Sequence, residues 1–433
     1  MKYYKQFVII APLALWAIFS LTVSRAAAAD DNCIACHREI NPDIVTAFQN
    51  DAHSAAGLSC AACHGGDQAL PDESAMEKKH GFIGAPKRPD IPAFCGKCHS
   101  DPGYMRNYNP SLPTDQADKY WTSRHGNLLK KGDAKVATCA SCHRAHGILS
   151  AKIPNSSVYP LNVPATCASC HAVAAYMAPY GIPTDQYAQY TDSSNVHGYA
   201  LFVKRDVGAP ACNDCHGNHG ANPPGVGSVG QVCTQCHALN GELFRNSPHK
   251  EAFDMLEVSE CAFCHQASPD ISDPHRRIHL IVHPTYRLIG TDQRAVCSQC
   301  HTSGDTGWST ATAISTERDT LEVKMARAKD LLNNVERRGF EISDARWLLD
   351  GEVRHSLMEL RTAVHAFNLN SYLPVYTKAD TALDKVLTAG YEAEKEVGGR
   401  RAYFIVITIL IAVLAVALTL KLREMAHGHK DEE

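Results

Sequence analysis

Hydrophobic residues recur with a helical period in the C-terminal part of the chain and show no regular period before it. Between residues 306 and 398, apolar positions three and four residues apart predict three amphipathic helices. We expect the first to be capped by Thr316 and to end at Gly339, the second to be capped by Ser343, and the third to begin near Pro374. Short connections between them predict an antiparallel bundle over 306–398.

An uncharged apolar segment follows the predicted bundle. Gly398-Gly399 leads into Ala402–Leu420, a run of nineteen residues without a charge. At a helical rise of 1.5 Å per residue this run is about 28 Å long, enough to cross the hydrocarbon core of a bilayer. We therefore expect a transmembrane helix over 399–422 and a short tail over 423–433.

The N-terminal segment has the order of a secretory signal. Lys2 and Lys5 precede the apolar run Phe7–Val23, and small residues follow that run. Residues 1–29 are therefore predicted to be a signal peptide, with an uncleaved N-terminal anchor as the alternative. Either one would carry the residues that follow to the oxidising side of a membrane.

The long segment 30–305 lacks the pattern of a conventional core. Gly and Pro are frequent in it, apolar periodicity is weak, and stretches such as 220–227 are typical of loops. We expect a mostly irregular and α-helical domain with little β-structure, in which short helices surround each sequence motif.

All eighteen cysteines of the chain belong to nine C-x-x-C-H motifs, the attachment signature of c-type haem. The two thiols of a motif form thioethers with the haem, and its histidine becomes the proximal iron ligand. Disulfides and zinc sites are the alternatives, but neither requires a histidine directly after the second cysteine. We therefore expect nine covalently bound haem c groups, attached through Cys33, Cys36, Cys60, Cys63, Cys95, Cys98, Cys139, Cys142, Cys167, Cys170, Cys212, Cys215, Cys233, Cys236, Cys261, Cys264, Cys297 and Cys300. The proximal ligands would be His37, His64, His99, His143, His171, His216, His237, His265 and His301.

The motifs are arranged in an internal duplication. Residues 95–146 and 167–219 repeat the same text, each with two motifs, a Pro-Thr-Asp-Gln segment and a His-Gly pair between them. Motif spacing extends this to four pairs that begin at Cys33/Cys60, Cys95/Cys139, Cys167/Cys212 and Cys233/Cys261. The motif at Cys297 is left over.

The second axial ligand decides whether a haem only transfers electrons or also has an open position for a substrate. Repeat position favours six distal candidates: His53, His125, His146, His197, His219 and His249. Of these, His125, His197 and His249 precede a motif by twelve to fifteen residues, and His146 and His219 lie three residues after a proximal histidine. His80, His275, His279 and His283 compete for the remaining places. His365, in the second predicted bundle helix, is a further hypothesis.

Two sites remain open at this level. The leftover motif at His301 is expected to take its distal ligand from the segment His275–His283 or from His365. Met105 and Met177 each follow a proximal histidine by six residues. Because histidines suffice, packing against a haem is the favoured role for both methionines, with iron ligation as the alternative.

Charge and remaining motifs narrow the function classes. The formal net charge is −4, and haem propionates would make the loaded protein more acidic. No basic stretch indicates nucleic acid, and no Walker, dinucleotide-binding or Ser/His/Asp pattern occurs. No catalytic residue is assigned.

The repeated C-x-x-C-H motifs, the upstream histidines and the C-x-x-C-H-x-x-H-G segments over about residues 33–305 resemble the multihaem cytochromes c of anaerobically respiring bacteria. A haem domain followed by a helical bundle is also similar to the octahaem group of hydroxylamine oxidoreductase and tetrathionate reductase, and to pentahaem nitrite reductase. Those enzymes keep one haem open, often with a lysine at the proximal position or an unusual attachment motif. All nine motifs here end in histidine, and no C-x-x-C-K occurs.

The combined expectation is a periplasmic nonahaem cytochrome with a C-terminal membrane anchor. Haem attachment outside the cytoplasm would leave the tail 423–433 cytoplasmic, and the anchor would hold one end of the haem chain near the bilayer. The expected partners are a quinol-oxidising membrane protein and other periplasmic or outer-membrane cytochromes. The alternative is a reductase of a small nitrogen or sulfur oxyanion with one five-coordinate haem, and a structural subunit of a respiratory complex is a third possibility.

Overall fold

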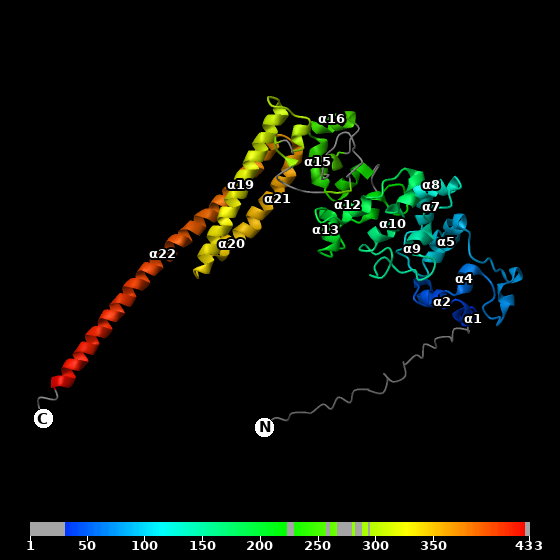
Figure 1. The fold of residues 1–433 in the computed structure, drawn as a ribbon, viewed down its shortest axis with the longest axis horizontal. Coiled ribbons are helices and arrows are strands. Elements are labelled where there is room, and N and C mark those ends of the chain that lie inside the picture. Colours follow the sequence, from blue (N-terminus) through cyan, green and yellow to red (C-terminus); the bar gives the residue numbers. More distant parts are fainter. Residues whose placement is uncertain are drawn as a thin grey trace, which may run out of the picture. The chain divides into compact units, whose positions relative to one another are not determined.

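Regular structure in the computed structural model is helical. The model describes residues 31–222, 229–256, 260–265, 279–281, 288–292 and 295–428, and these contain no β-strand. The predicted fold class is confirmed: an irregular part with short helices, a small helical bundle and one apolar C-terminal helix (Figure 1). The predicted signal peptide and the candidates His275 and His283 lie outside the described residues.

The chain forms two compact units. The first contains the described residues up to Thr166 together with His219–Ala221, and the second contains Cys167–Asn218 and the described residues from Asn222 onward. The division therefore falls within the motif-bearing segment. The domain boundaries predicted from composition, at 30, 306 and 399, stay predictions.

The first unit contains only short helices. They are α1 (Asn32–Ile40), α2 (Pro42–Gln49), α3 (Ala52–Ala55), α4 (Cys60–His64), η1 (Glu73–Met76), η2 (Lys78–His80), η3 (Arg88–Asp90), α5 (Ile91–His99), α6 (Pro102–Met105), α7 (Gln116–Thr122), α8 (Arg124–Lys130) and α9 (Cys139–His143). The next helix, α10 (Val163–His171), crosses the division.

The second unit combines short helices with the bundle. Its motif-bearing helices and connections are α11 (Ala174–Met177), η4 (Ala178–Tyr180), α12 (Gln186–Thr191), α13 (Val196–Phe202), α14 (Cys212–His216), η5 (Val229–Gln235), α15 (Ala238–Arg245), α16 (His249–Met255), α17 (Ala262–His265) and η6 (Cys297–Gln299). The bundle comprises α19 (Thr306–Arg337), α20 (Ser343–Leu348), the π-helical turn η7 (Leu349–Val353), α21 (Arg354–Ala363), η8 (Val364–Ala366) and α22 (Leu369–Gly428).

Several motifs are themselves one short helix. In α9 the Ser141 hydroxyl accepts a hydrogen bond from the Thr138 backbone N–H at 3.0 Å, which satisfies a donor at the helix start. After the histidine the chain turns through a positive φ, 69° at Arg144 and 76° at Gly217. Such a residue ends the helix, so the chain leaves each motif directly toward His146 or His219.

The first bundle helix begins well before the predicted cap. Asp305 caps α19, accepting a hydrogen bond from the Trp308 N–H at 2.6 Å. The prediction of Thr316 as the cap is wrong, because its hydroxyl donates to the Thr312 carbonyl within the helix (2.9 Å). The predicted end is confirmed: α19 stops at Arg337, and Gly339 follows with φ 81°.

The other two predicted boundaries also shift. Ser343 is the first residue of α20, and Ile342 occupies the cap position. The third helix begins at Leu369, so Pro374 lies inside it near its start. The helix α22 continues through Gly398-Gly399, which joins the predicted bundle to the predicted transmembrane segment. Glycine in a helix interior costs about 1 kcal/mol, which the long flanking helical segments tolerate.

The bundle has one continuous apolar core. Seventeen buried residues from its three segments form a single cluster: Ile314, Leu321, Ala328, Leu332, Val335, Ile342, Ala345, Leu349, Val353, Leu360, Ala363, Tyr372, Ala379, Ala382, Leu383, Val386 and Leu387. At one edge Lys324 of α19 pairs with Asp380 and Asp384 of α22. The amphipathic period in the sequence corresponds to this core.

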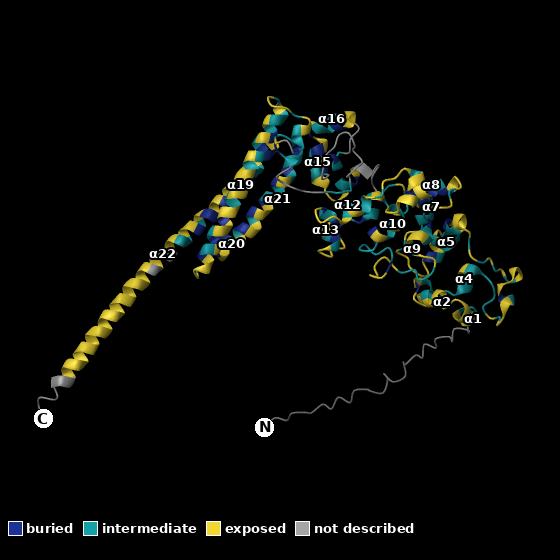
Figure 2. Cartoon of the chain, viewed as in Figure 1, coloured by how far each residue is buried: buried dark blue, intermediate teal, exposed yellow. Residues whose placement is uncertain are grey.

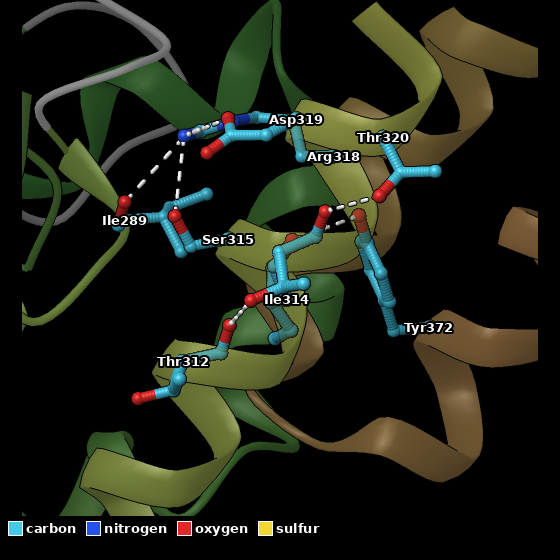
Figure 3. Close-up of polar contacts among 9 residues, drawn as sticks. Ile289, Thr312, Ile314, Ser315, Arg318, Asp319, Thr320 and Tyr372 are labelled. Carbon is cyan, nitrogen blue, oxygen red and sulfur yellow. Dashed lines mark hydrogen bonds and ion pairs between the residues drawn. The ribbon is translucent and has the colours of Figure 1, made fainter. Parts of the chain in front are cut away.

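Polar contacts join the bundle to the segment that leads to the ninth motif (Figure 3). Arg318 of α19 donates to the Ile289 carbonyl at 3.4 Å and to the Ser315 hydroxyl at 3.2 Å. Tyr372 of α22, which is 1% exposed, donates to the Ile314 carbonyl at 3.4 Å. The start of the bundle and the end of the motif region are therefore fixed to one another.

The C-terminal half of α22 is apolar and exposed along its length (Figure 2). Residues Ala402–Met425 have a mean hydropathy of 2.8, and none of this stretch is buried. By length and composition it is the one helix among the described residues that could cross a membrane and serve as an anchor.

Candidate haem-binding sites

The first cysteines of paired motifs lie side by side. Hydrogen bonds between thiols join Cys95 with Cys139, Cys167 with Cys212, and Cys233 with Cys261, and Cys33 is near enough to Cys60 to interact with it electrostatically. In the first of these bonds the Cys95 thiol donates to the Cys139 sulfur, which raises the pKa of Cys95 and lowers that of Cys139. The four pairs seen in the sequence are thus also pairs in space.

Second contacts link one pair to the next. Cys63 lies near Cys98, Cys215 near Cys233, and Cys264 near Cys297 and Cys300. Burial, and then the neighbouring motif's sulfurs, raise the pKa of Cys215 to about 11 and that of Cys264 to about 12. Within each unit the motifs therefore form an unbroken series, the first to fourth in one and the fifth to ninth in the other.

Six motif histidines face a histidine from outside any motif. In the first unit the ring centroids are 5.8 Å apart for His99 and His53, 6.1 Å for His64 and His146, and 6.1 Å for His143 and His219. In the second unit they are 5.6 Å apart for His216 and His279, 5.9 Å for His301 and His249, and 6.0 Å for His265 and His365.

These separations fit a haem iron between two imidazoles. A metal–imidazole bond is about 2 Å long, so two such bonds and half a ring on each side separate the centroids by about 6 Å. Each pair also lies beside the cysteines of its own motif, because its motif histidine directly follows the second cysteine. The donor set therefore suits haem c with two axial histidines.

Burial favours the neutral imidazole, which is the form that binds a metal. It lowers the pKa of His99, His143, His146, His216, His219, His249 and His365. The facing ring adds to this effect at His99, His143, His146 and His249. For His279, burial and then His216 lower the pKa to about 4.

The leftover motif departs from the sequence expectation. His249 faces His301, and His365 faces His265, whereas the sequence favoured His275–His283 or His365 for the ninth motif. The distal ligand of the ninth motif stays a prediction, with His249 as the residue that faces it. The cause of this arrangement is a small aromatic cluster: Phe253, on the same helix as His249, packs with Phe244 and Phe263. Phe367, beyond His365, contacts the His249 ring at 4.2 Å between centroids.

A spacing signal could have identified this partner. His53 precedes the second motif but faces the histidine of the third, and His249 precedes the eighth motif but faces the histidine of the ninth. The facing residue therefore lies one motif further upstream than the repeat alone suggested. His279, which was among four undistinguished candidates, is the one that the structure places against His216.

The remaining candidates lie on short elements. His125 and His197 are at the second position of α8 and α13, as His53 is in α3. His80 ends η2, His37 lies in α1, and both are half-buried. The ligands facing His37, His171 and His237 stay predictions. Met105 and Met177 are buried at equivalent places on α6 and α11, which suits a packing role.

Hydrogen bonds from the outer ring nitrogen orient several imidazoles. The Nδ1 of His53 contacts the Asp51 carboxylate at 2.8 Å, and that of His301 contacts Asp305 at 3.2 Å. The Nδ1 atoms of His64 and His365 instead lie 3.0 Å and 3.1 Å from the carbonyls of Gly84 and Thr362. For His53, His301 and His64 this leaves Nε2 for the facing position, whereas the Nε2 of His365 lies 3.4 Å from the amide nitrogen of Asn240.

Two known families match parts of the chain. A model of the cytochrome c3 family matches residues 52–172, and one of the cytochrome c554 and c-prime family matches residues 18–65. No curated protein and no solved structure matches the chain. The matched residues cover the first five motifs. Together, the two families and the motifs support a multihaem c-type cytochrome with covalently bound haem.

Proposed function

We propose that this chain is a membrane-anchored electron-transfer protein that carries nine haem c groups. The observation that supports this most directly is the set of six histidine pairs, each made of one motif histidine and one outside histidine at 5.6 to 6.1 Å. Haem c supplies one-electron transfer when bound, and an iron with two histidine ligands has no open position for a substrate.

The order of the motifs supports transfer along the chain. Cysteines of neighbouring motifs lie near one another within each unit, so that the side chains would hold successive haems next to each other. We propose His53, His146, His219, His249, His279 and His365 as distal ligands. Repeat position adds His197 for the motif at His237 and His125 for a further site. Of the candidates left without a motif, His80 is the nearest in sequence to the first motif.

The proposed topology puts the motifs in the periplasm, with the signal peptide removed and the tail after Ala402–Met425 in the cytoplasm. c-Type haem is attached on the oxidising side of a membrane, and the apolar part of α22 supports a single anchor. The proposed partners are a quinol-oxidising membrane protein and periplasmic or outer-membrane cytochromes of an anaerobic respiratory chain.

The length of α22 changes what the membrane partner must provide. The helix is continuous from Leu369 to Gly428, and its apolar part begins at Ala402. At 1.5 Å per residue, Ala402 lies about 50 Å along the helix from Leu369, which follows His365 closely. As an alternative to the predicted placement of one end of the haem chain near the bilayer, we propose that α22 stands upright from the membrane and holds these last sites away from it. The donor would then present its own redox centre outside the bilayer.

Intact mass of the purified protein tests the haem load. We expect the mature polypeptide plus nine haem units and no free thiol, because no cysteine lies outside a motif. A mass that corresponds to eight haems or fewer would contradict the proposal.

Ligation separates this function from the alternative reductase. We expect magnetic circular dichroism and EPR to report low-spin haems with two histidine ligands, and the reduced protein to bind little carbon monoxide. Stoichiometric binding of carbon monoxide at one haem of the unmodified protein would instead support reduction of a small nitrogen or sulfur oxyanion.

A further inference from the structure

Four distal candidates share a feature two residues upstream. Asp51, Ser123, Asn195 and Ser247 precede His53, His125, His197 and His249, and all four are buried polar residues, at 4%, 7%, 0% and 8% exposure. Each side chain accepts a hydrogen bond from a backbone N–H at the start of the helix that carries the histidine. Asp51, Ser123 and Asn195 are the helix caps of α3, α8 and α13, and Ser247 lies one residue before Pro248, the cap position of α16. The chain itself therefore varies the polar residue two positions before the histidine.

One of these four residues differs in charge. Asp51 Oδ1 accepts from the His53 N–H at 2.8 Å and lies 2.8 Å from the Nδ1 of the same residue. Its other oxygen, Oδ2, accepts from the Ile148 N–H at 2.7 Å. The side chain is only 3% exposed, so solvent screens this carboxylate weakly.

The neutral residues at these positions form hydrogen bonds with backbone groups. Ser247 accepts from the His249 N–H and donates to the Phe244 carbonyl, and Asn195 accepts from two backbone N–H groups of α13. The Nδ1 of His249 is buried and has no hydrogen-bond partner among the described residues. His53 and His249 thus each follow a buried polar residue by two positions, but the outer nitrogen has a carboxylate partner only in His53.

The carboxylate also reaches the neighbouring site. Ile148 lies two residues after His146, which faces His64, and the Ala52 N–H donates to the Ile148 carbonyl at 2.8 Å. Asp51 therefore links the helix that carries His53 to the segment that carries a second distal candidate, His146. Asn195 makes a related link, since its amide donates to the carbonyl of His279 at 2.6 Å.

We propose that Asp51 is a positioning residue. It gives the haem attached at Cys95 and Cys98 a lower reduction potential than the haem for which His249 is the proposed distal ligand. The inference rests on the proposed ligation by His53. A hydrogen bond from Nδ1–H to a buried carboxylate increases electron density at Nε2 and so favours the ferric over the ferrous state. The couple exchanges one electron with a neighbouring haem. The proton stays on Nδ1, so no proton is released or taken up.

The loss variants are Asp51→Asn and Asp51→Ser in the full chain. Asparagine and serine are the caps that the protein uses at equivalent positions, so both retain a helix cap and remove the charge. We expect potentiometric titration, followed by EPR, to show one haem shifted to a more positive potential. All haems should stay low-spin with two histidine ligands, because His53 itself is unchanged.

The gain variant is Ser247→Asp, which places a carboxylate two residues before His249. We expect one other haem to shift to a more negative potential. Asp72→Asn is the matched control. Asp72 also accepts a hydrogen bond from the backbone N–H two residues on (Ser74, 3.0 Å), but it is exposed and that residue is not a histidine. This control should leave every potential unchanged.

The outcomes separate the inference from the proposed function. If His53→Met alters the coordination of one haem but both Asp51 variants leave all potentials unchanged, Asp51 does not tune the site, and ligation by His53 stands. If His53→Met alters no haem, the ligation fails and the inference fails with it. Should the Asp51 variants not assemble, the absence of a negative shift in Ser247→Asp overturns the inference.

Discussion

The motif-bearing part and the C-terminal bundle are both helical, but they bury side chains in different ways. The bundle joins helices as long as the 32 residues of α19 around one cluster of buried apolar residues. In the motif-bearing part the α-helices have four to nine residues, and the eighteen cysteines are half-buried or exposed. Helices this short are marginal in water without tertiary contacts.

The difference identifies what stabilises each region. In the bundle, apolar side chains supply the buried surface, and a repeating pattern in the sequence reports it. In the motif-bearing part the exposed cysteines and paired histidines mark where haem faces would take that role. Folding of that region should therefore depend on haem attachment, and folding of the bundle should not.

Production of the protein without haem attachment is the largest expected perturbation. We expect the motif-bearing residues to lose their fixed structure completely and the bundle to keep its helices. Limited proteolysis followed by mass analysis should leave a resistant fragment that begins near Asp305. Equal resistance of the haem-free motif region would break the comparison, because it would show a core that needs no haem.

Truncation before Ala402 is the second perturbation. The apolar part of α22 makes no buried contact, so its removal should leave both regions folded and release a haem-loaded protein from the membrane fraction. Haem absorbance in the soluble fraction after cell breakage measures this. A truncated protein that stays with the membrane would indicate an uncleaved N-terminal anchor or a partner that retains it.

The same contrast explains what the sequence could predict. Residues such as Leu332 and Val335 recur at helical spacing, so the bundle was predictable, but Thr316 resembled a cap although its hydroxyl bonds within the helix. The haem motifs were predictable because covalent attachment fixes their local spacing. The facing histidines were less so, since the partner of His301 comes from a distant helix held by aromatic packing.

Leu332→Ala tests the bundle core by itself. Leu332 is fully buried, so the cavity should lower the free energy of unfolding by about 2–5 kcal/mol. Denaturant unfolding of the soluble truncated protein, monitored by circular dichroism, measures the loss. Val323→Ala is the control on the same helix, because Val323 is 71% exposed and should change stability by no more than about 0.5 kcal/mol. A changed haem spectrum in Leu332→Ala would mean that the two regions are not independent.

His365→Ala tests one point where the bundle reaches a haem site. Its ring stacks with that of His265 at 6.0 Å, so its loss should open one iron and let the reduced protein bind one carbon monoxide. Carbon monoxide difference spectra give the stoichiometry. His355→Ala is the control from the same part of the bundle, since His355 is exposed and pairs only with Glu359 in the described residues. No binding by His365→Ala would remove His365 from the proposed ligands.

Asp305→Ala tests a second point where the bundle reaches a haem site, and it should change stability least of these variants. Its carboxylate caps α19 through the Trp308 N–H and also contacts the Nδ1 of His301. Loss of the cap should lower the Tm of the bundle by about 2–4 °C, whereas Asp305→Asn, which can still accept the Trp308 bond, should lower it less.

The pH dependence of that Tm gives an independent check on Asp305. Hydrogen bonds from Trp308 and then Thr302 lower its pKa in the folded state. A carboxyl group with a depressed folded pKa contributes fully above its unfolded value of about 3.9 and loses that contribution as the pH falls through the folded value. The difference in Tm between the wild-type protein and Asp305→Ala should therefore be constant at neutral pH and shrink only in acid below about pH 4. A difference that already disappears well above pH 4 would show that the Asp305 carboxylate is not the source of the effect.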